Sequence, residues 1–257
     1  MTVIKIGGAL VARPDVLTTL WSAVAQIAAS RDVVVVHGGG PEATKVARML
    51  GHEPRIVQGR RITTTTDLRI VQWTMRGELN SVLVGQAYRA GVRAVGLSGA
   101  DGAILQVVKR PPKDVDGELI DFGRVGDVRA VDPMLLRLLF ENNYVPVVAP
   151  LGIHESGDLY NVNADTVSYE LAIALSASEY LLVTESGGVR RRKDDPDSLL
   201  STCSRVDFAL GTAEGWIDGG MHVKLTAAFE ALQSGVEDVY ILSADNILTR
   251  NDSTRVI

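Results

Sequence analysis

The chain has 257 residues, of which 46% are hydrophobic and 22% charged, with a formal net charge of −5. These proportions exclude a wholly disordered chain, and this length can bury a sizeable core. The acidic balance also argues against a nucleic-acid-binding protein, because phosphate binding needs a basic excess.

The sequence also argues against a secreted or membrane protein. No uninterrupted apolar run reaches the ~18 residues of a membrane span, and the first residues do not resemble a signal peptide. The single cysteine, Cys203, allows neither an internal disulfide nor a zinc pattern. We therefore expect a cytoplasmic protein with neither a membrane nor a nucleic-acid partner.

The first fifty residues predict the same unit twice, a strand followed by a glycine turn and a helix. The turns lie at Gly7-Gly8 and at 38–40, and Pro14 suits the first turn of a helix. This alternation is typical of a parallel sheet with crossover helices. The elements expected here are a strand over 3–6, a helix over 16–29, a strand over 33–36 and a helix over about 42–50.

The rest of the chain continues this pattern around one interruption. Residues 103–130 predict short strands, with a turn at Asp116-Gly117, inserted over one edge of the sheet. Gly157-Asp158 predicts a hairpin turn. The other expected elements are a helix from Thr66 or Asp67 to about 90, a strand over 92–97, a helix over 133–142, a strand over 144–149, a helix over 164–177 capped by Asn163, a strand over 180–184, a helix over 221–234 and a strand over 239–242.

Two lysines have unusual surroundings. Lys5 lies in an apolar strand, where burying an amine is costly unless it meets an anion; a structural ion pair is the alternative. Lys224 follows Gly219-Gly220 in the first turn of a predicted helix, where the helix dipole disfavours a cation. A bound polyanion would remove this conflict, and a surface lysine is the alternative. Glycine turns beside strands and helices suit phosphate, although the standard P-loop, dinucleotide and protein-kinase motifs are absent.

Five motifs extend over nearly the whole chain, from about residue 2 to 245. They are Lys5-Ile-Gly-Gly8, His37-Gly-Gly-Gly-Pro41, Gly59-Arg-Arg-Ile-Thr63, Asn161-Val-Asn-Ala-Asp165 and Gly219-Gly-Met-His-Val-Lys224. In this order they resemble the amino acid kinase family, and within it the N-acetylglutamate kinases. The resemblance implies an α/β fold, a three-layer αβα sandwich with a mainly parallel central sheet. It implies an N-terminal lobe (1–177) for the acyl-amino acid and dimerisation, and a C-terminal lobe (178–257) for ATP, sharing one sheet.

The resemblance also implies a reaction. The γ-phosphoryl group of ATP, with Mg²⁺ held mainly by the nucleotide and no protein metal ligand, would move to the side-chain carboxylate of N-acetyl-L-glutamate in arginine biosynthesis. This carboxylate is already ionised at pH 7, so transfer needs positioning and charge neutralisation rather than a base. The implied catalytic residues are Lys5 and Lys224, with Asp165 holding both. The other implied contacts are Gly7, Gly8, Gly40 and Gly220 with phosphate, Gly39, Gly40, Arg61 and Asn161 with substrate, and Thr184, Gly188 and Met221 with the nucleotide.

Some positions depart from the family pattern. Glu185 follows Thr184 where Asp or Asn is usual, Gly77-Glu-Leu-Asn80 replaces a Gly-Lys-x-Asn element, and Ala43-Thr44 replaces Ile-Asn.

Two alternatives stay open: a kinase for aminoadipate or glutamate carrying another blocking group or an acidic carrier protein, and a non-catalytic regulator. The basic cluster at 190–193 fits a solvated loop or a rim contact to a nucleotide phosphate. In the family that the motifs resemble, members that sense arginine carry an extra helix before the first strand. Here the first strand begins almost at Met1, so we also expect a homodimer with weak or no arginine inhibition.

Overall fold

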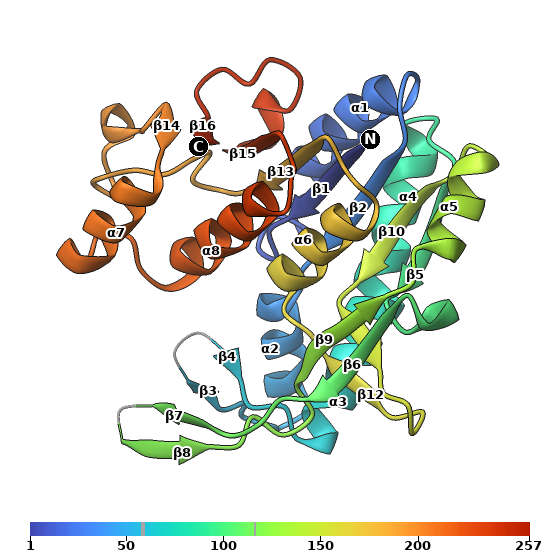
Figure 1. Ribbon diagram of the computed structural model, residues 1–257. Coiled ribbons are helices and arrows are strands. Elements are labelled where there is room, and N and C mark those ends of the chain that lie inside the picture. Colours follow the sequence, from blue (N-terminus) through green and yellow to red (C-terminus); the bar gives the residue numbers. More distant parts are fainter. Residues whose placement is uncertain (58–59, 116) are drawn as a thin grey trace.

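An eight-stranded sheet forms the centre of the computed structural model, which describes residues 1–57, 60–115 and 117–257 (Figure 1). Neighbouring strands are parallel except β15 and β16, which are antiparallel. The predicted, mainly parallel sheet is therefore confirmed. In spatial order the strands are β14 (Thr202–Cys203), β16 (Thr254–Val256), β15 (Asp238–Leu242), β13 (Glu179–Val183), β1 (Thr2–Ile6), β2 (Val33–His37), β10 (Val145–Ala149) and β5 (Ala94–Ser98).

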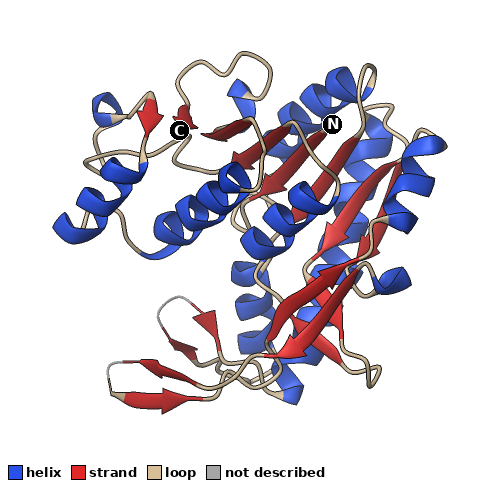
Figure 2. Cartoon of the chain, viewed as in Figure 1, coloured by secondary structure: helices blue, strands red, loops and turns tan. Residues whose placement is uncertain are grey.

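Helices cover both faces of this sheet and complete the predicted three-layer sandwich (Figure 2). One face packs against α1 (Pro14–Ala28) and α4 (Asn80–Arg89), which share a hydrophobic core with β1 and β2. The other face packs against α5 (Met134–Glu141), α6 (Ala164–Ala174) and α8 (Gly219–Gln233). Burial on both faces explains the unbroken β-branched runs of the central strands.

Side-chain alternation along β1 decides where its one charged residue points. Val3 belongs to the core beneath α6 and α8, whereas Ile4 and Ile6 belong to the core beneath α1 and α4. Lys5 therefore faces the same side as Val3, toward α6 and α8.

The predicted β-rich insertion is present, but its position differs from the prediction. It forms a second sheet that continues from the C-terminal ends of β5 and β10 instead of lying over an edge of the first sheet (Figure 1). Its strands, in spatial order, are β12 (Leu159–Asn161), β11 (Leu151–Ile153), β6 (Leu105–Lys109) and β9 (Gly126–Val131). Two hairpins accompany it, β3 (Ile56–Val57) with β4 (Arg60–Arg61), and β7 (Lys113–Val115) with β8 (Glu118–Ile120).

The long helix predicted to end near residue 90 is divided into three segments. These are α3 (Thr65–Val71), a π-helical segment (Gln72–Leu79) and α4. The predicted cap was wrong, because Thr64 caps α3 and Asp67 is the third helical residue, which completes a capping box. Next to α3, α2 (Gly40–Met49) begins directly at the glycine turn after β2.

The residue patterns between 185 and 218 predict no element, although α7 (Arg205–Glu214) and β14 lie there. Ser204 and Asp207 form a capping box at the start of α7, which is a local signal that the prediction missed. Gly59 of the third motif and Asp116 of the predicted turn lie outside the described residues. Within the described ranges, no helix combines the length and the apolar character needed to cross a bilayer.

Candidate active site

A buried ion pair lies where β1 meets the beginning of α6. Lys5 Nζ lies 2.7 Å from Asp165 Oδ1, and the two side chains are 4% and 9% exposed. Asp165 is placed there because Asn163 caps α6 as predicted, accepting hydrogen bonds from the backbone N–H groups of Asp165 and Thr166. The structure thus brings together a lysine and a carboxylate that lie 160 positions apart in the sequence.

Lys224 approaches the same place from α8. This helix begins at Gly219, two residues earlier than predicted, so Lys224 lies in its second turn, and its Nζ donates to Gly220 O at 3.1 Å. Burial lowers the pKa of Lys224, and nearby Lys5 lowers it further, while Asp165 acts in the opposite direction. Among the described ion pairs Asp165 binds Lys5 alone, so the predicted contact of Asp165 with both lysines is seen for one of them.

The two glycine turns touch one another beside this ion pair. A Cβ atom on Gly8 would lie 2.9 Å from the backbone nitrogen of Gly39, and one on Gly38 would lie 3.2 Å from both Gly8 Cα and N. Side chains are therefore excluded where the turns meet. Gly40 begins α2 and has open space where its Cβ would be. The free N–H groups at the start of α2 make this a suitable place for an anion.

Arg61 enters the site from β4, and its guanidinium makes three contacts, two with side chains and one with a backbone carbonyl. Its Nη1 lies 3.4 Å from Asp67 Oδ1, and its Nη2 donates to Thr44 Oγ1 at 2.6 Å and to Gly40 O at 3.3 Å. The guanidinium thus lies directly beside the Gly40 turn. Asn161 donates through Nδ2 to Thr63 Oγ1 at 3.2 Å, next to the strand that carries Arg61.

His37 was not among the predicted site residues, although it ends the buried strand β2. Its Nδ1 lies 2.9 Å from Gly38 O and its Nε2 lies 3.1 Å from Asn80 Nδ2. Burial lowers the pKa of His37 to about 4, so the ring is neutral at pH 7 and donates through Nδ1 while accepting through Nε2. The sequence signal was a polar residue at the end of an apolar strand.

The three residues predicted to contact the nucleotide lie near the other half of the sheet. Thr184 follows β13, where its backbone N–H donates to Leu242 O at 2.8 Å. Gly188 is buried, and a Cβ there would lie 2.8 Å from Thr254 Oγ1, so close packing alone requires glycine. Met221 lies in the first turn of α8 and packs on the core of that face. In the basic cluster, Arg192 pairs with Asp195 on an exposed loop.

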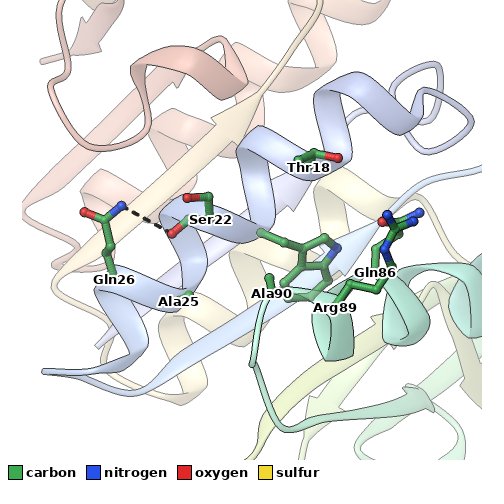
Figure 3. A pocket seen from close by; sticks show the side chains of 8 residues that line it. Thr18, Ser22, Ala25, Gln26, Gln86, Arg89 and Ala90 are labelled. Carbon is green, nitrogen blue, oxygen red and sulfur yellow. Dashed lines mark hydrogen bonds between the residues drawn. The ribbon is translucent and has the colours of Figure 1, made fainter.

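A separate groove lies on the opposite face of the molecule, between α1 and α4 (Figure 3). It has a volume of about 400 Å³ and is lined by Thr18, Ser22 and Gln26 from α1 and by Gln86 and Arg89 from α4. Because Lys5 points toward α6 and α8, the central sheet separates this groove from the lysine pair. The groove is therefore not part of the candidate active site.

Comparison with known proteins agrees with this geometry. The model of the amino acid kinase family matches residues 1–243, and the chain belongs to that family, which confirms the predicted family and fold. The chain is 40% identical to the acetylglutamate kinase of Symbiobacterium thermophilum, over 93% of this chain and 83% of that protein. It is also 40% identical to the acetylglutamate kinase of Methanopyrus kandleri, over 96% and 97%. The crystal structure of smu.665 from Streptococcus mutans has a TM-score of 0.83 and 26% identity, over 99% and 97%.

Proposed function

We propose that this protein is an acetylglutamate kinase, which transfers the γ-phosphoryl group of ATP to the side-chain carboxylate of N-acetyl-L-glutamate in arginine biosynthesis. The observation that carries the proposal is the Lys5–Asp165 ion pair beside two touching glycine turns, with Lys224 close by: burial lowers the pKa of Lys224, and the charge of Lys5 lowers it further. The curated relatives at 40% identity support the same reaction.

The proposed chemistry follows from charge. Both substrates are anionic, and the transferring phosphoryl group spreads negative charge over its equatorial oxygens. The amines of Lys5 and Lys224 would neutralise that charge, and N–H groups at Gly7, Gly8, Gly40 and Gly220 would donate to phosphate oxygens. A carboxylate acceptor is ionised at pH 7, so neutral His37 has no role as a base. Phosphoryl transfer here rests on positioning.

We assign Mg²⁺ to the phosphates of ATP. The described ranges contain no group of three or more His, Cys, Asp or Glu side chains that could hold a metal ion. Mg²⁺ characteristically binds through substrate phosphates in kinases, so the residues present are consistent with this assignment. When bound, the ion would neutralise phosphate charge alongside the two lysines.

The substrate side of the proposed site is the second sheet and its hairpins. Arg61 would bind a carboxylate of the acyl-amino acid, with Asn161 and the Gly39-Gly40 turn beside it. The alternative substrate, held on an acidic carrier protein, would favour free basic side chains here. Most of the other described basic residues of this region are instead paired with carboxylates, in Arg55–Glu118, Lys109–Asp121, Arg110–Asp127, Arg124–Asp158 and Arg129–Glu155, whereas Arg60 and Lys113 belong to none of the described ion pairs. This pairing favours a free amino-acid derivative.

The direct test is an ADP-release assay with N-acetylglutamate, N-succinylglutamate, N-acetylaminoadipate and unblocked glutamate. We expect the highest kcat/KM for N-acetylglutamate and hydroxylamine-trappable acyl phosphate as product. A preference for aminoadipate or another blocking group would change the assigned substrate. No ADP release with any of the four would support the regulator alternative.

The lobe functions, the assembly and the location are further parts of this proposal. Residues 1–177 would bind the acyl-amino acid and 178–257 would bind ATP across a sheet that β1 and β13 join. We propose a cytoplasmic homodimer. The dimer is supported by Trp73 and Tyr88, whose apolar side chains are exposed on segments that contact the edge strand β5. Light scattering should give twice 27.6 kDa, and a mass of 27.6 kDa at micromolar concentration would contradict the dimer.

A further inference from the structure

The Arg61 guanidinium already has partners for most of its hydrogen-bond donors. A guanidinium carries five N–H donors. In the structure Nη2 donates to Gly40 O and Thr44 Oγ1, and Nη1 faces Asp67 Oδ1. These contacts leave Nε and one Nη1 hydrogen. A carboxylate that binds through Nη2 therefore has to replace one of the two Nη2 partners.

Of these two partners, Thr44 is the replaceable one. Gly40 O belongs to the first turn of α2 and is fixed by the backbone, whereas Thr44 is a half-buried side chain one turn later. Thr44 Oγ1 also donates to Gly40 O at 3.0 Å, so the hydroxyl keeps this partner after losing Arg61. A carboxylate accepts a stronger hydrogen bond from a guanidinium than a neutral hydroxyl does.

Asp67 holds the other side of Arg61. Its side chain is 2% exposed, and its Oδ2 accepts from the backbone N–H and the hydroxyl of Thr64 in the capping box of α3. Its Oδ1 also lies 3.0 Å from His52 Nε2. Burial raises the pKa of Asp67, but its hydrogen bonds to Thr64 and His52 outweigh burial and leave the pKa below its ordinary value. The carboxylate is thus ionised and anchored independently of Thr44.

We propose that the Thr44 hydroxyl accepts a hydrogen bond from Arg61 Nη2 in the free enzyme and that the substrate carboxylate replaces this hydroxyl on binding. Asp67 keeps the guanidinium in place throughout. The inference rests on the proposed function, because it assumes that Arg61 binds that carboxylate. Thr44 is a specificity-determining residue in this scheme: a neutral amide or ester in place of the carboxylate gains little by replacing a neutral hydroxyl. Thr44 also stands at one of the positions where this sequence departs from the family pattern.

The test is titration calorimetry of N-acetylglutamate, together with steady-state kinetics, on Thr44→Val, Thr44→Ser and Asp67→Asn. Valine keeps the shape of threonine but removes the competing acceptor, so Kd should fall about 2- to 10-fold, the value of one neutral hydrogen bond. Serine retains the hydroxyl and should keep the wild-type Kd. Asp67→Asn should raise Kd about tenfold or more, because the ionic partner of Arg61 is lost.

Thr18→Val is the matched control, because Thr18 makes the same hydroxyl-to-carbonyl bond one turn back, to Pro14 O at 2.9 Å on α1. It should leave Kd and kcat unchanged. An unchanged or higher Kd in Thr44→Val, or a wild-type Kd in Asp67→Asn, would overturn the inference alone. If the wild-type protein binds N-acetylglutamate but does not turn it over, only the proposed function is overturned. If the wild-type protein does not bind N-acetylglutamate, both the proposed function and the inference are overturned.

Discussion

At the scale of single residues, the distinguishing feature is two amines that lie near one buried carboxylate. Lys5 has a direct partner in Asp165, whereas Lys224 is held by a backbone carbonyl. Two like charges close together are costly unless an anion joins them. The site therefore carries an unneutralised positive charge that a phosphoryl group would match.

Lys224→Ala should lower kcat by about 10²-fold or more, since removing one preorganised donor from a phosphoryl or oxyanion site has effects of that size. Lys5→Ala should lower kcat at least as much and also lower the melting temperature, because Asp165 would stay buried without its partner. Turnover by the ADP-release assay and circular dichroism would separate the two effects. Lys193→Ala, in the exposed loop, is the control, and near-normal turnover of both site variants would remove the lysines from catalysis.

The lowered pKa of Lys224 also predicts a pH profile. As the pH rises through this lowered pKa, the amine loses its proton and kcat/KM should fall. This decline should begin at a pH below the ordinary lysine pKa of about 10.4. Lys224→Arg, whose guanidinium stays charged, should move this decline to higher pH while lowering the plateau. A profile of the same shape in wild type and variant would contradict the assignment.

At the scale of elements, the site is made where turns and helix beginnings converge at one edge of the sheet. In parallel strands the carboxyl ends lie at the same edge, so the turns after β1 and β2 meet there. The starts of α2 and α6 point to the same edge, and Ala164 at the start of α6 lies 3.9 Å from the Cβ position of Gly38.

Gly8→Ala tests this convergence. The added Cβ would lie 2.9 Å from the backbone nitrogen of Gly39, so the two turns would have to move apart. We expect a loss of kcat/KM of about 10²-fold, as for a misplacement of about 1 Å. Gly85→Ala on α4 is the matched control, because its Cβ would meet no atom within 4 Å. This control should keep full activity and be more stable by about 0.5–1 kcal/mol. Equal activity of the two variants would contradict the predicted role of the turn.

At the scale of the whole molecule, one continuous sheet connects the two halves of the site. β1 carries Lys5 and pairs with β2 on one side and β13 on the other, so it lies at the centre of both halves. Two hydrophobic cores, one on each face, fix the sheet between its helix layers. His37 and Asn80 join the sheet to α4 at the end of β2, where Asn80 Nδ2 also donates to Val147 O at 2.9 Å.

The buried neutral His37 makes global stability depend on pH. Its pKa is about 4 when folded and about 6.5 when unfolded, so between these values the unfolded chain binds more protons. Stability contributed by neutral His37 is complete above pH ~6.5 and is lost as the pH falls toward ~4, by about 3 kcal/mol. Arg76 opposes protonation as well, whereas the Gly38 carbonyl favours it. The free energy of unfolding, measured with urea at several pH values, should depend more steeply on pH in the wild type than in His37→Asn over this range. Parallel plots of this free energy against pH would contradict the prediction.

Several features could be predicted from the residues themselves. The Gly7-Gly8 and Gly38–Gly40 turns, the Asn163 cap and the central strands follow from local patterns, and Lys5 stood out because it interrupts an apolar strand. The contacts of Arg61 could not be predicted, because Thr44 and Asp67 come from two helices and no local pattern relates them. The cap of α3 was misplaced because four consecutive threonines offer equivalent candidates.

By itself the sequence determined the order of strands, turns and helices, the family and the identity of the charged groups, because these depend on short-range periodicity and residue type. Only the tertiary structure decided which charges meet. The parallel sheet brings Lys5, Asp165 and Lys224 to one end, and it seats Arg61 against Thr44 and Asp67. The net charge of −5 is a sum over the whole chain, while the fold brings Lys5 and Lys224 near one another, where we propose that phosphate binds.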